Sequence, residues 1–379
     1  MNICIMCQDF PPLIGGIAAH VHELSKALAK QGNEVHVIVP RYPYNLKWEE
    51  NFDGIHVHRV FQIRKRFLSG NLYIPFAIAK LLSVIKKHNI DVVHYHSSYP
   101  ESIITKYIKN KPVIFTAHES GFLEMASNER FINKLKYRLS HPDIIIGPSQ
   151  ELADVPTKFG VDKNKTIFIS NGVDVDKFSP SISGSRIREK YKVKDDEIVV
   201  LCPRRLAPKN GVIYLIEAIP QIAAINQKIK FVIVGEGGFK KQRTEMEDTL
   251  INLSLDDKVI FTGDIPNHEM PEFFAASDIV VLPSLMEATS IAGLEAMSSS
   301  KPLIGTTVGG IPYLIDDNIT GILVPPKDSE ALANAIDRLT KDEDMRNYMG
   351  LNARKKVETE FSWEIIAKKT LRIYEELIV

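Results

Sequence analysis

The segment Glu287-Ala-Thr-Ser-Ile-Ala-Gly-Leu-Glu295 carries two carboxylates that can bind sugar hydroxyl groups. A carboxylate has two acceptor oxygens, which suit adjacent hydroxyls of a ribose or a hexose. We expect Glu287 to lie in the loop after a strand and Glu295 in the helix that follows. Backbone N–H groups of Thr289, Ser290 and Ile291, at the start of that helix, can then bind a diphosphate between the two sugars. From the spacing alone, two surface glutamates on an ordinary helix would be the preferred interpretation.

Three cations, Arg204, Arg205 and Lys209, closely follow a predicted strand and are candidates for binding a diphosphate. The chain has no P-loop, and Gly235-Glu-Gly-Gly lacks the Gly-x-Gly-x-x-Gly spacing of a dinucleotide-binding loop. Basic side chains and helix N-termini must therefore supply the phosphate contacts. The alternative, that the arginines are solvated or paired with neighbouring acids, stays open.

Two patterns raise the question of a bound metal, and we expect none. Asp174-Val-Asp176 spells the Asp-x-Asp string of metal-dependent transferases, but it follows Asn171-Gly172, where a turn or a helix cap explains it at least as well. His94 and His96 share a strand face and could chelate zinc, but the sequence indicates no third ligand.

These residues must be positioned by an α/β scaffold, because short apolar β-rich runs alternate with helical periodicity along the chain. Continuous Val/Ile runs of this kind are typical of parallel sheets covered by helices on both faces. The predicted strands are Asn2–Cys7, Glu34–Val39, Ile55–Val60, Asp91–His96, Pro112–Ala117, Asp143–Gly147, Thr166–Ser170, Glu197–Cys202, Lys230–Gly235, Lys258–Thr262, Asp278–Pro283, Pro302–Thr306 and Gly321–Val324.

The strand pattern restarts near residue 197, after a Ser-rich stretch at Pro180–Ser185 that is typical of a linker. We therefore predict two doubly wound domains, 1–180 and 181–361, followed by a helix at 362–379. Ligands of open parallel sheets bind at the carboxyl ends of the strands. Unusual residues follow the strands of both halves, which predicts a cleft between facing domains. They include Gly15, Gly16, His118, Asn171, Arg205, Gly235 and Glu287.

Composition excludes several classes of function. Lys plus Arg equals Asp plus Glu at 47 each, so no overall field attracts nucleic acid. The N-terminus does not resemble a signal peptide, and the longest apolar stretch, Leu72–Ile85, is too short to span a bilayer. We expect a cytoplasmic protein.

A peripheral contact with the inner membrane face is a further hypothesis, because Arg59 and the basic run Arg64-Lys65-Arg66 precede the apolar stretch Leu72–Ile85. A solvated loop followed by a packed helix is the favoured alternative.

Taken together, the motifs resemble the retaining GT-B glycosyltransferases of family four over nearly the whole chain. Each motif is short, but their ordered set is specific. The motifs are Phe10-Pro-Pro-x-x-Gly-Gly16, Asp91-Val-Val-His-x-His96, Thr116-Ala-His118, Ser170-Asn-Gly-Val-Asp174, Arg205-Leu-x-Pro-Lys209, Val234-Gly-Glu-Gly237, Phe261-Thr-Gly263, the Glu287–Glu295 segment, Gly309-Gly-Ile-Pro312 and Asn318-x-x-Gly-x-Leu-Val324.

The resemblance implies two Rossmann-like domains, with the first on the acceptor side and the second binding a nucleoside diphosphate sugar. It implies that Glu295 binds the ribose, that Glu287 binds the transferred sugar, and that Arg205 and Lys209 bind the diphosphate without a metal or other cofactor. Gly16 and the Thr289–Ile291 backbone assist. His118 is expected near the anomeric centre or the sugar hydroxyls, and the final helix is expected to pack back on the first domain.

Two departures from the family pattern affect these expectations. Asn210 stands where the family usually has lysine, with Lys209 one place earlier, so the residue that meets the phosphate is open. The family often has Glu-Gly-Phe-Gly where this chain has Glu287-Ala-Thr-Ser, which bears on sugar preference. The expected activity is retaining hexosyl transfer from a nucleoside diphosphate sugar to a glycan or lipid-linked acceptor. A nucleotide-sugar epimerase of the same architecture and a non-catalytic nucleotide-sugar-binding protein are the alternatives.

Overall fold

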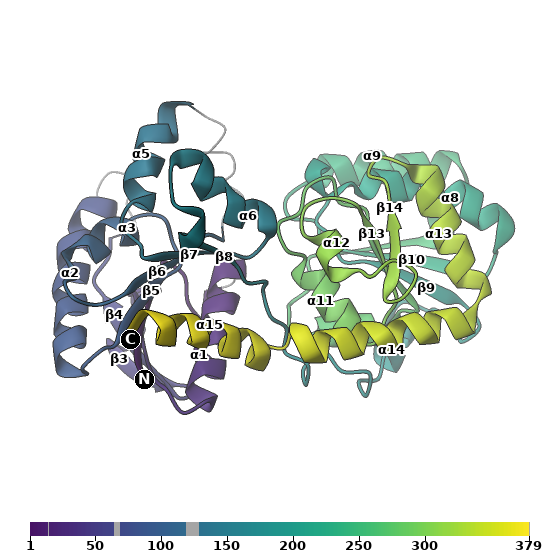
Figure 1. The fold of residues 1–379 in the computed structure, drawn as a ribbon. Helices are drawn as coiled ribbons and strands as arrows, with labels where there is room; N and C mark the ends of the chain where they lie inside the picture. Colours follow the sequence, from purple (N-terminus) through teal and green to yellow (C-terminus); the bar gives the residue numbers. More distant parts are fainter. Residues whose placement is uncertain (14, 64–68, 119–128, 379) are drawn as a thin grey trace. The chain divides into compact units, whose positions relative to one another are not determined.

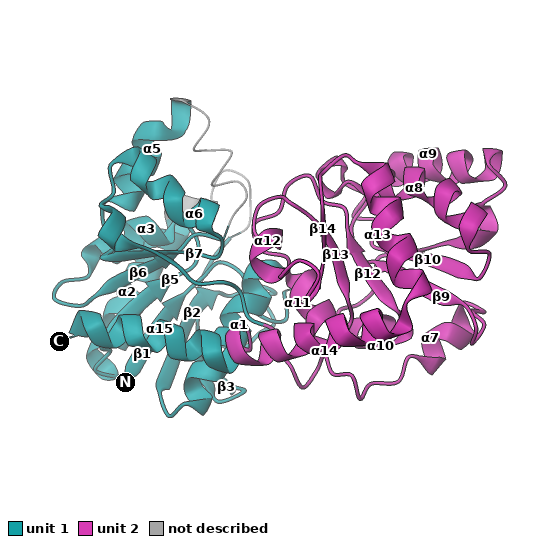
Figure 2. Cartoon of the chain, turned by 45° about the vertical axis from the view of Figure 1, so that its right-hand side comes forward, with its two compact units in different colours: residues 1–172, 363–379 teal, residues 173–362 magenta. Residues whose placement is uncertain are grey.

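The computed structural model describes residues 1–13, 15–63, 69–118 and 129–378, which form two compact units. Unit 1 comprises Met1–Gly172 and Trp363–Val379, and unit 2 comprises Val173–Ser362 (Figure 2). The basic run Arg64-Lys65-Arg66 lies outside the described residues. Among the described helices, none is long and apolar enough to cross a membrane.

Unit 1 is built on an eight-stranded sheet of order β3-β4-β2-β1-β5-β6-β7-β8 (Figure 1). All its strand pairs are parallel except β3 with β4. The strands are β1 Asn2–Met6, β2 Glu34–Pro40, β3 Glu49–Phe52, β4 Ile55–Val60, β5 Val92–Tyr95, β6 Val113–Thr116, β7 Ile144–Gly147 and β8 Thr166–Phe168. The helices are α1 Gly16–Lys30, α2 Ser69–Lys87, α3 Glu101–Ile104, α5 Glu129–Leu139, α6 Gln150–Asp154 and α15 Trp363–Ile378, with short 3-10 turns η1 Thr105–Tyr107, η2 Val155–Phe159 and η3 Lys163–Lys165.

Alternate residues of the unit 1 strands bury opposite faces of the sheet, as a period of two requires. Val35, Val37 and Val39 of β2 pack with Val21 and Leu24 of α1 in one core cluster. The final helix α15 joins the same cluster through Ile366, Ala367, Ile373 and Tyr374 and packs beside α1.

Unit 2 is built on a six-stranded, all-parallel sheet of order β11-β10-β9-β12-β13-β14. The strands are β9 Ile198–Cys202, β10 Ile229–Val234, β11 Val259–Gly263, β12 Ile279–Leu282, β13 Leu303–Thr306 and β14 Gly321–Val324. The helices are α7 Ser185–Lys190, α8 Val212–Ile225, α9 Lys240–Asn252, α10 Met270–Ala276, α11 Ile291–Ser298, α12 Ile311–Leu314, α13 Ser329–Lys341 and α14 Glu343–Glu360, with 3-10 turns η4 Pro208–Asn210 and η5 Asp256–Lys258.

Both faces of the unit 2 sheet are covered. Val200 and Cys202 of β9 belong to the core cluster that contains α8 and α13, whereas Val199 and Leu201 belong to the cluster of α10, α11 and α14. Because the strands are parallel, their carboxyl ends meet at one edge, and the loops that leave this edge carry the predicted donor-binding residues of unit 2.

Candidate functional site

The Glu287–Glu295 segment adopts the conformation predicted from its sequence. Glu287 lies in the loop after β12, and Glu295 lies within α11. Arg204, after the end of β9, forms an ion pair with the Glu287 carboxylate and donates a hydrogen bond of 2.7 Å to Ser290 Oγ. The same Ser290 oxygen caps α11 by accepting the Gly293 N–H at 3.1 Å. Arg204 is therefore paired with a neighbouring acid, as the alternative interpretation of these arginines proposed. This ion pair fixes the Glu287 loop.

Two glycines after β13 support the same loop by letting the backbones approach closely. A Cβ added to Gly309 would lie 1.6 Å from the carbonyl oxygen of Glu287, and one added to Gly310 would lie 2.1 Å from that of Ala288. The Gly310 N–H donates to the Glu287 carbonyl at 3.2 Å. Only glycine can occupy these two positions unless the Glu287 loop is displaced.

Arg205 and Lys209 are exposed, and neither has a hydrogen-bond or ion-pair partner among the described residues. Asn210 is buried and donates its side-chain amide to the Arg205 carbonyl at 2.8 Å, which shapes the turn between β9 and α8. The Lys209 carbonyl accepts the N–H groups of Leu285 at 2.8 Å and Met286 at 3.2 Å. The turn is thus held by its backbone and by Asn210, while the charged ends of Arg205 and Lys209 stay available.

The glycine-rich loop Gly235–Gly238 lies against Arg205. A Cβ added to Gly237, whose φ is 64°, would lie 2.6 Å from Arg205 Cδ, so the stem of Arg205 packs along this backbone. Asp264 accepts the N–H of Glu236 at 2.8 Å and that of Gly237 at 3.0 Å. These two hydrogen bonds, with the charge of Arg205, lower the pKa of the Asp264 carboxyl and keep it ionised.

Glu295 is 7% exposed, so the interpretation of two surface glutamates is wrong for this residue. Burial raises the pKa of its carboxyl to about 7, against the opposing effects of Lys177, a hydrogen bond from Asn267 and the charge of Arg204. Lys177 in turn donates to the Asn267 side chain. With a pKa of about 7, the Glu295 carboxyl is close to half-protonated at neutral pH.

The remaining predicted residues belong to unit 1 and are linked through His20 of α1. The Asn171 side-chain oxygen lies 2.8 Å from His20 Nδ1, and the His20 and His118 ring centroids are 4.2 Å apart. Gly15 and Gly16 precede this helical turn, and a Cβ on either would meet no atom within 4 Å. Asn171 thus holds His20, and the described residues leave the positions beside Gly15 and Gly16 open.

His118 has a hydrogen-bond partner that the sequence does not reveal. Its Nε2 lies 2.8 Å from Nδ1 of His96, and the two rings stack. Burial lowers the pKa of His118 and of His96 well below the usual range and that of His20 to about 4. His118 is therefore a neutral imidazole at physiological pH.

The structure shows how His94 and His96 are surrounded. His94 lies 2.6 Å from Tyr374 Oη and 2.7 Å from Thr116 Oγ1, so both of its ring nitrogens have protein partners. Among the described residues, one ring nitrogen each of His20, His96 and His118 lies within 4.8 Å of the others, a grouping that the sequence does not indicate.

Asp174-Val-Asp176 forms a turn, as the favoured interpretation of this motif predicted. Asp174 Oδ1 accepts the N–H groups of Asp176 at 3.1 Å and Lys177 at 2.9 Å. This carboxylate oxygen is therefore occupied by the backbone of its own turn.

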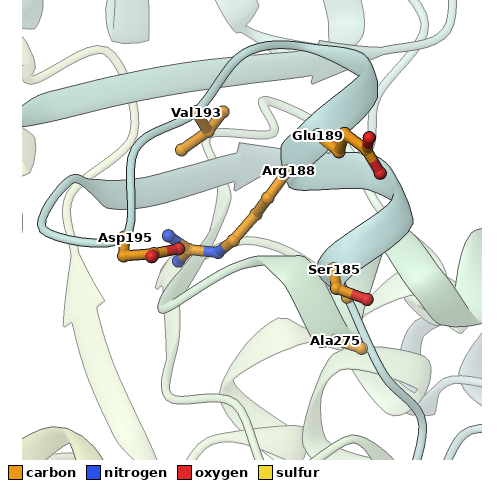
Figure 3. Close-up of a pocket in the computed structure, with 7 residues that line it drawn as sticks. Ser185, Arg188, Glu189, Val193, Asp195 and Ala275 are labelled. Carbon is orange, nitrogen blue, oxygen red and sulfur yellow. The ribbon is translucent and has the colours of Figure 1, made fainter.

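A pocket in unit 2 lies at the opposite, amino-terminal edge of the sheet. It is lined by residues of α7 and of the segment that leads into β9, together with Ala275 of α10 (Figure 3). Arg188 in this pocket donates to the carbonyls of Ala276, Lys194 and Glu197 and to the Asp278 carboxylate. Its guanidinium is therefore engaged in holding α7 to the neighbouring backbone and to Asp278.

Four residues that contact or face the predicted ones are not singled out by the sequence. They are His20, Lys177, Asp264 and Asn267. A signal existed for His20, because it is a polar residue on the buried face of α1 beside Val21 and Leu24. Nothing in the sequence relates Asn267 to Glu295, since only tertiary structure brings them together.

Comparisons with known proteins bear on the family and the fold of this chain. The family described as Glycosyltransferase Family 4 matches residues 14–177, and that described as Glycosyl transferases group 1 matches residues 184–356. An uncharacterized glycosyltransferase of Methanocaldococcus jannaschii is 30% identical over 388 residues, covering 99% of this chain and 98% of that protein. The N-acetyl-alpha-D-glucosaminyl L-malate synthase of Bacillus anthracis is 26% identical, covering 100% and 97%. The solved structure of Anabaena HepE in complex with UDP has a TM-score of 0.80 at 21% identity and covers 100% of both chains.

Proposed function

From the premise that this chain belongs to the group 1 glycosyltransferases and has their GT-B fold, we propose that it transfers a hexosyl group from a nucleoside diphosphate sugar to a glycan or lipid-linked acceptor, with retention of configuration. One observation carries this proposal. Arg205 and Lys209 are exposed cations without a hydrogen-bond or ion-pair partner among the described residues, at the strand edge from which the Glu287 loop leads into α11 and Glu295.

In the proposed complex the donor lies along the carboxyl edge of unit 2. Arg205 and Lys209 bind the diphosphate, assisted by the backbone N–H groups at the start of α11. Glu295 accepts the ribose hydroxyls, and the buried position of its carboxyl supports this role. Glu287, held by Arg204, orients the transferred sugar. Lys209 rather than Asn210 meets the phosphate, since the Asn210 amide is engaged with the Arg205 carbonyl.

The chemistry that these residues support is stabilisation of a leaving diphosphate. Breaking the glycosyl–phosphate bond develops negative charge on the diphosphate, and a preorganised cation aimed at it contributes about 3 kcal/mol to the transition state. We propose that Arg205 and Lys209 do this without a metal. Retention then follows if the acceptor enters from the leaving-group face and passes its proton to a phosphate oxygen. Glu287 serves as an orienting group and not as a nucleophile, because Arg204 already pairs with its carboxylate.

Unit 1 contributes His118 in this proposal. As a neutral imidazole it can share a hydrogen bond with a sugar hydroxyl near the anomeric centre without adding a charge. Gly15 and Gly16 leave room for the donor at the start of α1, and Asn171 acts on the site through His20.

The proposal is tested by thermal-shift screening of wild type and Arg205→Ala with UDP-, GDP- and ADP-sugars, followed by product analysis of each stabilising donor. A donor that binds only the native state raises its stability by mass action, so one nucleotide class should raise the melting temperature of wild type much more than that of the variant. With an acceptor present, a transferase yields a glycoside, and without it only slow donor hydrolysis. Conversion of the donor in acceptor-free buffer would instead identify an epimerase, and donor binding without any turnover a non-catalytic binding protein.

A membrane contact is a secondary part of the proposal, made through α2. Its residues Leu72 and Phe76 are 37% and 51% exposed, and the Phe76 ring contacts Phe61, which is 40% exposed. Such a surface can insert at a lipid headgroup boundary. Co-sedimentation with anionic vesicles at low salt should fall on Phe76→Ser substitution. Equal sedimentation of the two proteins would reject the contact.

A further inference from the structure

A second group of histidines lies in unit 1, away from every residue discussed above. It comprises His36 on β2, His58 on β4 and His88 immediately after α2. His36 is fully buried, and the His58 and His88 side chains are 8% and 22% exposed. His36 lies in the first half of β2 and His58 in the second half of β4, and both strands contact α2.

Carboxylates fix which nitrogens of the two buried rings carry hydrogen. Glu34 Oε1 lies 3.0 Å from His36 Nε2, and Glu49 Oε1 lies 3.4 Å from His58 Nδ1. An ionised carboxylate only accepts hydrogen bonds, so these two ring nitrogens are donors. In neutral rings the remaining nitrogens, His36 Nδ1 and His58 Nε2, must then be lone-pair acceptors.

Those two acceptor nitrogens face each other at 3.0 Å. Two lone pairs at this distance repel unless a cation lies between them. A metal ion fits this spacing, since tetrahedral ligands with Zn–N bonds of 2.0–2.1 Å are separated by roughly 3.3 Å.

His88 supplies a third nitrogen. Its Nδ1 lies 3.6 Å from Glu34 Oε1, and its Nε2 is buried without a hydrogen-bond partner among the described residues. One ring nitrogen of each of the three histidines lies within 4.8 Å of the others. Tetrahedral coordination requires these nitrogens to be separated by roughly 3.3 Å, and the partly exposed ring of His88 is the one with room to adjust. A carboxylate behind a ligating histidine, as Glu34 and Glu49 provide here, holds the ring and its tautomer in metal sites.

We propose that His36, His58 and His88 bind a divalent transition metal ion of the zinc class, with water in the fourth position. Neutral imidazoles favour this class over the hard cations Mg²⁺ and Ca²⁺. The other groups that face the site are His56, whose ring stacks on His36 at 4.9 Å, and Lys80, which binds Glu49 at 3.0 Å. Because its ligands come from β2, β4 and the end of α2, the ion would fasten this helix to the sheet and act on stability, separately from donor binding.

The test is equilibrium dialysis of the tag-free, EDTA-treated chain against ZnCl₂ with a competing chelator, read by elemental analysis. Wild type should bind one zinc ion in this group. His88→Gln, the mildest change because its side chain is the most exposed of the three, should weaken that binding at least tenfold, and His58→Gln should do the same. The matched control is His56→Gln, which replaces an exposed histidine of β4, the strand that carries His58. This variant should bind zinc like wild type.

Zinc should also raise the melting temperature of wild type and of His56→Gln but not of His88→Gln, which distinguishes a specific site from adventitious binding. Unchanged zinc affinity in both His88→Gln and His58→Gln would overturn the proposal. Loss of zinc binding in His96→Gln together with unchanged affinity in those two variants would overturn it as well. Absence of zinc binding to wild type would equally overturn it and would indicate a simple hydrogen bond between His36 and His58. Neither result bears on the donor site, since no nucleotide is present.

Discussion

Three cations follow β9, but their surroundings differ. Arg204 pairs with Glu287 and binds Ser290, whereas Arg205 and Lys209 have no such partner among the described residues. The sequence predicts that this turn is basic and places it at a strand end. It does not distinguish Arg204 from Arg205, because the distinction depends on which side chain points to the Glu287 loop and which packs along Gly237.

Replacing Arg205 with alanine should lower turnover by about a hundredfold at saturating donor, since a positioned cation contributes about 3 kcal/mol to leaving-group stabilisation. Initial-rate measurements with the donor found by the thermal-shift screen give this value. Arg243→Ala is the matched control, because Arg243 pairs with Glu236 and Glu247 and should retain wild-type turnover. Wild-type rates in Arg205→Ala would remove Arg205 from the mechanism.

Glu295 should make unit 2 less stable as pH rises. The pKa of its carboxyl is about 7 in the folded chain and 4.5 in the unfolded chain. Below pH 4.5 the carboxyl is protonated in both states, so its burial costs no free energy of ionisation. Between pH 4.5 and 7 the native state holds the proton that the unfolded state releases, and stability falls with increasing pH. Glu295→Gln should therefore be more stable than wild type above pH 7, by up to about 3 kcal/mol.

Chemical unfolding at pH 5 and pH 8, followed by circular dichroism, measures this difference. Glu189→Gln, an exposed glutamate of α7, is the control and should show no such gain. A Glu295→Gln variant no more stable than wild type at pH 8 would contradict the raised pKa.

At the scale of elements, hydrophobic pattern predicts most of the scaffold. Each of the predicted strands corresponds to an observed strand whose ends agree within two residues, because continuous Val/Ile runs identify buried parallel strands. The pattern misses β3, whose sequence Glu49-Glu50-Asn51-Phe52 is mostly polar. This short strand pairs antiparallel with β4 at the sheet edge and needs little apolar surface.

Gly309→Ala should destabilise the Glu287 loop strongly, by several kcal/mol, because its Cβ would overlap the Glu287 carbonyl in addition to the strain of a φ of 52°. Gly238→Ala is the matched control. Its φ is 82° but its Cβ would meet no atom within 4 Å, so only the strain of about 1 kcal/mol is expected. Equal losses in the two variants, measured by chemical unfolding, would show that the Gly309 contact is unimportant.

On the scale of the whole molecule, the chain passes between units at Gly172–Val173, ahead of the Ser-rich stretch that suggested a boundary near residue 180. Val173 and Phe178 lie in the core of unit 2, and Arg354 of α14 donates to the Val175 and Phe178 carbonyls. Linker-like composition could not reveal these contacts. The expected cleft between the domains, and the donor site within it, stay predictions.

Unit 1 should lose stability on mild acidification. Burial lowers the pKa of His20 to about 4, that of His94 to about 3, and those of His96 and His118 well below the usual value. Below pH 6.5 the unfolded state therefore binds protons that the native state does not, at about 1.4 kcal/mol per pH unit for each fully shifted group. Stability should be constant above pH 6.5 and should fall between pH 6.5 and 5.

Tryptophan fluorescence follows this transition selectively, because both tryptophans, Trp48 and Trp363, belong to unit 1. The His94→Gln variant has one titrating ring fewer and should show a shallower dependence on pH. Stability that does not change between pH 6.5 and 5 would contradict the neutral state assigned to these histidines, including that of His118 in the proposed mechanism.

The most direct measurement of the central claim is a crystal structure of the chain with bound UDP, GDP or ADP. Diphosphate oxygens should lie within hydrogen-bond distance of Arg205 and Lys209, and ribose hydroxyls should bind Glu295. A nucleotide bound on another surface, with these three side chains free of it, would contradict the donor site and the proposed activity together.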